Sequence, residues 1–480
     1  MNTESKQYRK TILSDPVSIL KATAHEIDKD KITTVNLLHK SYQSLREQHK
    51  QQQIEVKVIS REIGKAKSKQ LPFDSLIQTM KDKGQQLSQT KLSLKEAEEA
   101  LYAFFLPQKT ATEDVEIANQ SPLPRSRYRE ECPTVTNEDI TIKALTSEHA
   151  EWDQYVENNP AATLYHQTKW QTLINECFGH ETHYLFAKDQ KNRIIGVLPL
   201  IRLNSRIFGD FLVSMPYFNY GGAIGDSLEI EQKLIKSAND LGASLSVKHI
   251  EYRDDIDRTA LAARTDKVNM ILALPTEETG LWKNIGSKLR AQIKRPQREN
   301  PQICIGKEEL IDDFYTVFAR NMRDLGTPVY DKSFFTSILR YYPDHSNIIV
   351  VYLKNRPVSA GFLIGDKGTL EIPWASTDRR VNHLSMNMLM YWEILKFAIE
   401  KNYRYFDFGR SSKDAGTYKF KQQWGAQPKP SYWHYWLAQD VEMPGLNPKN
   451  PKYALVIYVW KKLPIFITKW LGPHIVKNLP

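Results

Sequence analysis

The residues best suited to chemistry lie between positions 403 and 427, where aromatic, acidic and basic side chains alternate with glycine. Residues 403–408 have the composition of a buried strand, which we expect to end at Gly409. The loop that follows contains Arg410 and Lys413, and such a loop can bring cations and backbone N–H groups to one ligand. These two residues are therefore candidates for binding a phosphate or carboxylate, because open α/β folds bind ligands at the carboxyl ends of strands. A surface loop with ordinary solvated charges is the alternative.

A second aromatic and basic segment, residues 418–421, is predicted to be a strand. Lys419 and Lys421 are two positions apart, so they would share one face of that strand and could act together. Asp407 lies between aromatic residues and could orient a neighbouring cation or accept a proton. Tyr418 could position a substrate through its hydroxyl group. A solvated edge strand for the lysines, and structural roles for Asp407 and Tyr418, are the alternatives.

Two further segments carry candidate substrate-binding residues. Residues 287–295 follow Trp282 and form a predicted helix, on which Arg290 and Lys294 share one face with Lys283, and Lys288 lies next to that face. Its candidates are Lys288, Arg290 and Lys294. Residues 217–225 are rich in glycine and aromatic residues, and Tyr220 could line the floor under a planar substrate. A basic surface helix is the alternative for the first segment, and the second lacks the spacing of a phosphate loop.

Composition limits the class of protein that must position these residues. With 480 residues, the chain is expected to form two or three domains, and 41% apolar content is enough for a sizeable core. The net charge of +10 favours anionic partners such as nucleic acid, nucleotide-linked substrates or anionic lipid. The three cysteines are isolated, and no metal-ligand spacing is present, so no metal is predicted. Together with the polar N-terminus and the absence of a long uncharged apolar stretch, this favours the cytoplasm.

The first 106 residues are predicted to form an antiparallel coiled-coil hairpin. A seven-residue series that is apolar except at His49 runs from Val35 to Ile63, and an apolar one runs from Met80 to Leu101. The two runs are separated by a breaker at residues 71–74, where the second helix can be capped. Residues 107–138 contain several prolines and are predicted to be a semi-extended linker.

Basic residues cluster as the first helix approaches the hairpin turn. They are Lys57, Arg61, Lys65, Lys67 and Lys69. The stretch from Leu45 to Lys69, above all Ile63-Gly-Lys-Ala-Lys67, resembles the N-terminal arm of seryl-tRNA synthetase. This resemblance implies that the basic residues bind tRNA, and a rigid basic arm suits the shape and phosphates of a folded RNA. An ordinary solvated coiled-coil surface is the alternative.

The rest of the chain carries a weak internal repeat that predicts an α/β fold with two lobes, residues 139–275 and 276–440. A helix, a strand, a polar turn and a strand occur at residues 170–201 and again at 334–364. In each half a second amphipathic helix and a strand follow. A mixed sheet flanked by helices, formed twice, is the architecture that this order favours.

This order resembles the FemAB family, whose fold is a doubled GNAT acyltransferase lobe. The resemblance covers residues 139–440 and rests on three stretches: 163–170, Gly196-Val-Leu-Pro199, and the segment from Phe406 to Gly425. The C-terminal stretches 447–452 and 471–474 resemble FemAB-like proteins of exosortase/PEP-CTERM exopolysaccharide loci. The resemblance therefore implies an acceptor among cell-envelope or exopolysaccharide precursors.

The resemblance also implies a reaction. FemAB enzymes transfer an aminoacyl group from aminoacyl-tRNA to an amine, so an activated ester is attacked without a serine or cysteine nucleophile. It places Lys421, or its neighbour Lys419, where a lysine stabilises the tetrahedral oxyanion or the terminal phosphate, and the helix at 287–295 near the substrate cleft. No permanently bound cofactor is implied, and aminoacyl-tRNA or acyl-CoA would be the donor.

Two rival functions remain open at this point. An acyl-CoA-dependent N-acyltransferase would need a glycine-rich pyrophosphate loop entering a helix, whereas residues 378–387 contain two arginines and no glycine. A non-catalytic RNA-binding or scaffold protein with a degenerate core is the second rival. The sequence predicts neither the acceptor nor the oligomeric state.

The C-terminal segment, residues 441–480, is apolar and aromatic with interspersed lysines. Lys461, Lys462 and Lys469 argue against a membrane-spanning helix, whereas Trp460 and Trp470 suit an interfacial helix pair. We therefore expect peripheral contact with an anionic membrane, on its inner face, or docking of the segment on the core.

Overall fold

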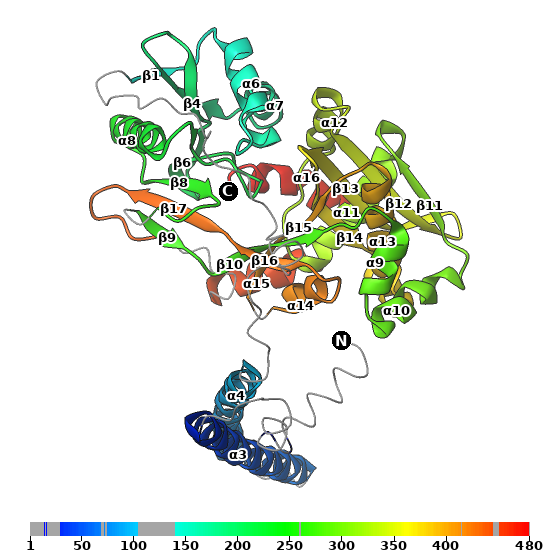
Figure 1. Ribbon diagram of the computed structural model, residues 1–480. Coiled ribbons are helices and arrows are strands. Elements are labelled where there is room, and N and C mark those ends of the chain that lie inside the picture. The colour runs from blue at the N-terminus through cyan, green and yellow to red at the C-terminus, as the bar shows by residue number, and fades with distance from the viewer. Residues whose placement is uncertain are drawn as a thin grey trace. The chain divides into compact units, whose positions relative to one another are not determined.

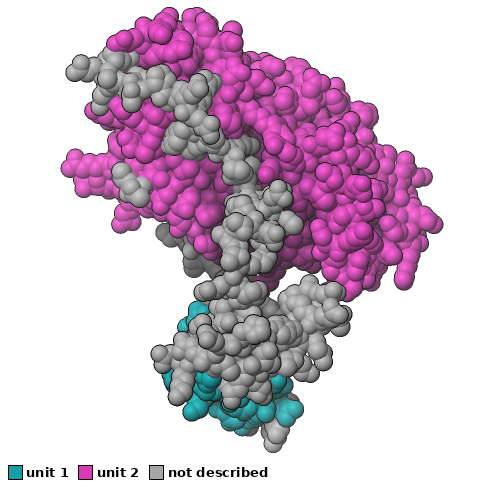
Figure 2. Space-filling model, viewed as in Figure 1, with its two compact units in different colours: residues 1–119 teal, residues 120–480 magenta. Residues whose placement is uncertain are grey.

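The computed structural model describes residues 29–68, 74–103, 140–258, 261–413, 415–444 and 451–479, together with Ser14, Pro16 and Pro72. The chain divides into two compact units, residues 1–119 and 120–480, which Figure 2 colours separately. The predicted linker, 107–138, lies outside the described residues.

The first unit contains two long helices that pack against each other, α3 (Lys29–Ser68) and α4 (Asp74–Ala103). Val35, Tyr42 and Ile63 from the predicted seven-residue series are buried, which confirms that α3 uses this face for packing. An ion pair of 2.9 Å joins Glu55 of α3 to Lys83 of α4. These residues lie at similar distances before and after the connection between the helices, as expected for an antiparallel pair. The predicted helical hairpin is therefore present.

The first lobe of the second unit is built around two sheets (Figure 1). Their strand orders are β1-β3-β4-β7 and β2-β5-β6-β8-β17-β9. The strands are β1 (Thr141–Ala144), β2 (Glu181–Thr182), β3 (Leu185–Lys188), β4 (Ile194–Leu198), β5 (Ile201–Ser205), β6 (Gly209–Val213), β7 (Ile224–Gly225), β8 (His249–Asp254), β9 (Ala262–Arg264) and β17 (Tyr432–Leu437). The helices are α6 (His149–Asn158), η2 (Leu164–His166), α7 (Lys169–Phe178) and α8 (Leu228–Ser244).

The second lobe has one seven-stranded sheet in the order β11-β12-β13-β14-β15-β10-β16. Its strands are β10 (Lys267–Ala273), β11 (Gln302–Gly306), β12 (Ser346–Leu353), β13 (Arg356–Asp366), β14 (Thr369–Thr377), β15 (Tyr405–Ser412) and β16 (Gln427–Pro430). Its helices are α9 (Glu278–Asn284), α10 (Ser287–Gln297), η3 (Glu308–Leu310), α11 (Ile311–Leu325), α12 (Lys332–Tyr341), η4 (Arg379–Leu384), α13 (Met386–Glu400) and α14 (Gly416–Gln422). The chain ends with α15 (Pro451–Trp460) and α16 (Ile465–Val476).

The predicted duplication is present in the structure. In both lobes a helix leads into an antiparallel hairpin, α7 into β3–β4 and α12 into β12–β13. Both lobes also contain a parallel pair whose second strand follows a helix, β6 with β8 and β14 with β15. The chain therefore has the α/β fold of two tandem GNAT-like lobes preceded by a helical hairpin.

The two lobes exchange strands across the boundary predicted at residues 275 and 276. β10 precedes that boundary but lies in the second-lobe sheet, between β15 and β16. β17 comes from the predicted second lobe but lies in the first-lobe sheet, between β8 and β9. The lobes are therefore joined by backbone hydrogen bonds within the sheets. The order of elements along the sequence does not reveal such pairing.

Two local predictions within residues 403–427 are wrong. Gly409 does not end the strand: it adopts φ +75° within β15, which continues to Ser412, so Arg410 lies in a strand and not in a loop. Residues 418–421 belong to helix α14. Because successive residues of a helix are separated by about 100°, Lys419 and Lys421 lie on different faces, and Lys421 is buried whereas Lys419 is exposed.

The C-terminal helices dock on the core. α16 packs against α11, with Thr468, Gly472 and Val476 buried. The Lys477 carbonyl accepts a hydrogen bond of 2.7 Å from the Tyr217 hydroxyl. Among the described residues, we find no helix with the length and apolarity needed to traverse a bilayer.

Candidate functional site

Strands β14 and β15 are neighbours over only three residue pairs and then part. The last pair brings Glu371 opposite Asp407, after which β14 continues to Thr377 and β15 continues to Ser412 along β10 instead. Two adjacent parallel strands that separate leave backbone groups and side chains facing the space between them. The two carboxyl groups therefore stand at the point where the sheet opens.

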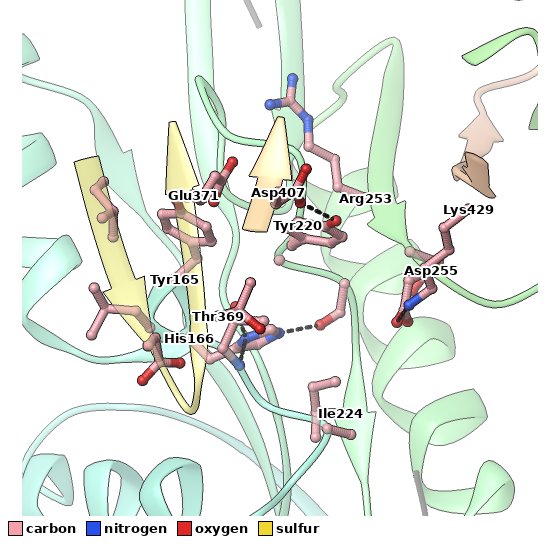
Figure 3. A pocket seen from close by; sticks show the side chains of 18 of the residues that line it. Tyr165, His166, Tyr220, Ile224, Arg253, Asp255, Thr369, Glu371, Asp407 and Lys429 are labelled. Atoms are coloured by element: carbon pink, nitrogen blue, oxygen red, sulfur yellow. Dashed lines mark hydrogen bonds and ion pairs between the residues drawn. The ribbon is translucent and has the colours of Figure 1, made fainter. Parts of the chain in front are cut away.

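A cavity of about 60 Å³ lies at this point, between the two lobes. Its lining comes from η2, the segment before β7, the end of β8, and strands β10, β13, β14, β15 and β16. Figure 3 shows Glu371 and Asp407 next to one another at one end of it. One water molecule occupies about 30 Å³ of liquid, so the cavity has room for a group the size of a primary amine.

Tyrosine hydroxyl groups from the first lobe hold both carboxyl groups. Tyr165 donates a hydrogen bond of 2.6 Å to Glu371 Oε2, and Tyr220 donates one of 2.7 Å to Asp407 Oδ2. The Gly409 backbone N–H donates to Asp407 Oδ1 at 2.7 Å. The carboxyl groups thus have fixed orientations, and the contacts from Tyr165 and Tyr220 join the two lobes at the cavity.

Burial and mutual repulsion disfavour ionisation of this pair. Burial, with the neighbouring Asp407 charge, raises the pKa of Glu371 to about 8. Burial also raises the pKa of Asp407, while the hydrogen bonds from Tyr220 and Gly409 and the charge of Lys421 oppose the rise. A buried pair of carboxyl groups whose pKa values are raised in this way can bind an ammonium group and accept its proton.

The raised pKa of Glu371 predicts how stability depends on pH. Its value rises from 4.5 to about 8 on folding, so the stabilisation is full below pH 4.5 and is lost as the pH rises to about 8. Each tenfold change in proton affinity corresponds to about 1.4 kcal/mol, so we expect ionisation of this residue to lower the free energy of unfolding by about 5 kcal/mol across that range.

Glu371→Gln should remove most of this loss, which urea denaturation at several pH values would measure. Glu176→Gln is the matched control, because Glu176 accepts a similar hydrogen bond from Tyr341, of 2.7 Å, but is exposed. A pH dependence that Glu371→Gln leaves unchanged would contradict the assignment.

Lys421 reaches the same region from helix α14. Its Nζ donates hydrogen bonds to the carbonyl oxygens of Gly409 at 2.9 Å and Arg410 at 3.1 Å. Burial lowers the pKa of Lys421 to about 8, although the Asp407 charge opposes this shift. An ammonium group has three N–H donors, so these two carbonyls leave one donor for a ligand oxygen.

Arg410 forms a second, half-buried cationic feature. Its guanidinium lies 3.7 Å from the centre of the Trp433 ring, and that of Arg253 lies 4.3 Å from the same ring. Burial, followed by the neighbouring Arg253 charge, lowers the pKa of Arg410 to about 10. Arg253 already forms an ion pair of 2.9 Å with Glu251, so Arg410 is the cation at this indole that suits an anionic group. Lys413 follows in an exposed turn, and Tyr418 is half-buried and packs on the second-lobe core.

The predicted candidates on the basic helix do not line the cavity. Lys288, Arg290 and Lys294 lie on α10, which packs against α13. Lys294 Nζ lies 5.5 Å from the centre of the Trp282 ring, so this cation contacts the nearby indole and not the cavity. Of the predicted residues, the structure brings Asp407 and Tyr220 to the cavity and Lys421 and Arg410 beside them.

Glu371 and Tyr165 were not singled out from the sequence. Glu371 is preceded and followed by apolar residues in a strand whose neighbours are buried, and a carboxyl group in such a run is the signal that could have found it. Tyr165 belongs to the stretch at 163–170 that carried the family resemblance, but no pattern indicated that its hydroxyl meets a carboxyl group 206 residues away.

A second, polar groove of about 260 Å³ lies where β14 leads into α13. Asn321, Arg379, Asn382, Asn387 and Phe420 are among its lining residues. Arg380, next to Arg379, is held by Asp378 through an ion pair of 2.6 Å. The groove offers amide and guanidinium donors to a polar or anionic group.

The second-lobe part of the site lies in a region that matches a known family model. Residues 287–422 match the family model described as acetyltransferase (GNAT) domain, a range that includes Glu371, Asp407 and Lys421. No curated protein sequence matches the chain. Among solved structures, FemX matches with a TM-score of 0.49 and 13% identity, over 61% of this chain and 96% of FemX.

Two other solved structures are similar at lower scores. The C-terminal domain of a putative lysylphosphatidylglycerol synthetase from Agrobacterium fabrum has a TM-score of 0.42 and 10% identity, over 60% of this chain and 90% of that one. A tandem GNAT protein from the clavulanic acid biosynthesis pathway has a TM-score of 0.38 and 10% identity, over 62% and 98%. The domain match at residues 287–422, on a core of two GNAT-like lobes, supports an acyltransferase.

Proposed function

We propose that this protein transfers an acyl group, in particular an aminoacyl group, from an activated ester or thioester to an amine. The observation that carries the proposal is the buried pair Glu371 and Asp407 where β14 and β15 part. An amine in water at neutral pH is mostly an ammonium ion, which cannot attack a carbonyl. The pair provides both a counter-charge for that ion and an acceptor for its proton.

The reaction needs no covalent enzyme intermediate. Glu371 takes one proton from the bound ammonium, and the nitrogen lone pair attacks the carbonyl carbon of the donor. The carbonyl electrons move to oxygen, and the remaining Lys421 N–H donates to that oxyanion. When the tetrahedral intermediate collapses, the C–O or C–S bond breaks, the nitrogen gives its second proton to the leaving oxygen or sulfur, and the amide forms. Glu371 then releases the proton that it took from the ammonium to solvent.

The donor that we favour is aminoacyl-tRNA, because the helical hairpin supplies a rigid basic surface. Lys57 and Arg61 are exposed on α3, the side chains of Lys65 and Lys67 are not described, and Lys69 lies outside the described residues. The proposed acceptor is an amine of a cell-envelope or exopolysaccharide precursor, which rests on the resemblance of the C-terminal stretches to proteins of PEP-CTERM loci. These two choices are independent of the role of the carboxyl pair.

Acyl-CoA is the second candidate donor, and the polar groove beside α13 favours it. Arg379, Asn382 and Asn387 offer donors that suit a phosphate group. No glycine is present in the helix entry at residues 378–387, so backbone N–H groups are less accessible there than in a glycine-rich loop.

One experiment distinguishes these donors. The full chain is incubated with either radiolabelled aminoacyl-tRNA or radiolabelled acetyl-CoA, together with a panel of primary amines. We expect a labelled product that survives mild alkali, because an amide is stable where the aminoacyl ester is not. Product from acetyl-CoA alone would replace the tRNA proposal, and no product from either donor would contradict transferase activity.

Charge reversal on the arm should weaken binding to tRNA. Lys57→Glu with Arg61→Glu removes two contacts to phosphates, and about one counterion is released per contact, so we expect the Kd for tRNA to rise at least about tenfold at low salt. Gel shifts over a series of salt concentrations measure it. Lys40→Glu with Lys50→Glu, exposed on the same helix further from the turn, is the control. Equal losses in both variants would show that net charge alone matters.

A further inference from the structure

The C-terminal helices combine positive charge with exposed apolar side chains. Residues 443–480 contain six lysines and neither aspartate nor glutamate. Nine large apolar side chains are exposed in the described part of residues 140–479, and five of them lie in α15 and α16. They are Val456, Tyr458, Val459, Phe466 and Trp470. Exposed apolar residues that gather in one segment mark a contact surface.

The opposite sides of these helices are fixed to the core. Trp460 and Val476 are buried, and Gly472 lies so close to the Val329 backbone that a Cβ there would come within 2.8 Å of it. The Arg323 guanidinium donates to the Leu463 carbonyl at 3.1 Å, between the two helices. The exposed side chains are therefore presented by helices that are already docked.

Each helix presents its exposed residues along a ridge. Phe466 and Trp470 are four positions apart and 72% and 70% exposed, so they project from one side of α16. Val456 and Val459 are three positions apart on α15. Lys461 and Lys462 are exposed between the helices, and Lys462 Nζ lies 5.8 Å from the Tyr458 ring. Aromatic rings beside lysines have the chemistry of a segment that lies at a membrane interface.

We propose that α15 and α16 bind the surface of an anionic phospholipid bilayer. Phe466 and Trp470 would enter the boundary between headgroups and acyl chains, and Lys461 and Lys462 would contact lipid phosphates. A second copy of this chain is a poorer partner, because it would bring the same lysine-rich, acid-free segment against this one. Folded RNA would contact the lysines but would leave the aliphatic residues in water. The proposal does not depend on the reaction at the carboxyl pair.

Vesicle flotation with the full chain tests this. We expect binding to vesicles of phosphatidylcholine with about one-third phosphatidylglycerol, weakening as salt is added, and little binding to phosphatidylcholine alone. Phe466→Ser with Trp470→Ser should lower the partition coefficient at least about tenfold, because two large apolar groups no longer leave water. Lys461→Gln with Lys462→Gln should lower it about fivefold per lysine.

Three controls separate this surface from others. Ile207→Ser removes an equally exposed apolar residue, 85% exposed in the first lobe, and should leave binding unchanged. Lys57→Glu with Arg61→Glu tests whether the basic arm binds the vesicles instead. Unchanged melting temperatures show that the variants fold. Absent binding of the wild type, equal binding to neutral vesicles, or full binding by the Phe466 and Trp470 variant would overturn the proposal, as would a dimer that depends on these residues without vesicle binding.

Discussion

Glu371→Gln is expected to lower kcat by about 100- to 1000-fold, the usual contribution of a positioned general base. The glutamine side chain has nearly the size of glutamate, and its amide oxygen can still accept a hydrogen bond from the Tyr165 hydroxyl. In the structure that hydroxyl lies 2.6 Å from Glu371 Oε2. What it loses is the ability to take a proton from the attacking ammonium. KM for the amine should also rise, because the counter-charge at the cavity is reduced.

The pH profile separates this role from a structural one. Glu371 must be ionised to accept a proton, and burial beside Asp407 raises its pKa to about 8, so the wild-type rate should rise with pH up to that value. In Glu371→Gln the remaining activity should no longer show this rise. Glu176→Gln, which alters an exposed carboxyl group that also accepts from a tyrosine, should change kcat less than about twofold. A full rate with an unchanged profile in Glu371→Gln would contradict the assignment.

Lys421→Met should lower kcat by about 100- to 1000-fold, the loss typical of one oxyanion donor. Lys421 Nζ is held between the carbonyl oxygens of Gly409 and Arg410, beside the point where the strands part. Lys419→Met is the matched control, because Lys419 lies two positions away on the same helix but is exposed. It should retain nearly full activity. Equal losses in the two variants would show that α14 acts as a whole and would remove the specific role of Lys421.

Lys421→Arg tests the same role through the pH dependence of the rate, which can be measured even if the variant is partly destabilised. Burial lowers the pKa of Lys421 to about 8, and the group must be protonated to donate, so the wild-type rate should fall above that pH. Because Glu371 must be ionised and Lys421 must be protonated, and both pKa values are about 8, the pH optimum should lie near 8. An arginine stays charged, so the variant should keep its rate at higher pH. A falling limb at the same pH in Lys421→Arg would assign that ionisation to another group.

Helices and strands with a strong period were predictable because their signal is local. The seven-residue series from Val35 to Ile63 repeats often enough to define one face of α3, and Val35, Tyr42 and Ile63 on that face are buried. The repeated order of helix, strand, turn and strand was readable for the same reason. Each of these elements contains its own periodicity, so it needs no information from distant residues.

Short elements have a weaker periodic signal in the sequence, and this is why the prediction of a strand at residues 418–421 was wrong. α14 has only seven residues, and an alternation of aromatic and basic residues over four positions fits a strand as well as one turn of helix. The tertiary structure decides, because Lys421 is buried against the carbonyl groups of β15 while Lys419 remains in solvent. The prediction that Gly409 would end its strand failed for another reason: glycine often ends a strand, but here it adopts φ +75° within β15.

The sequence by itself determined the helical hairpin, the doubled α/β core and the buried strand that contains Asp407. Only the tertiary structure decided the site. Glu371 meets Tyr165 from 206 residues away, and Asp407 meets Tyr220 from 187 residues away. The exchange of β10 and β17 joins the two lobes through backbone pairing. Such contacts depend on which strands pair across the fold, and that pairing leaves no periodic trace in the residues that make it.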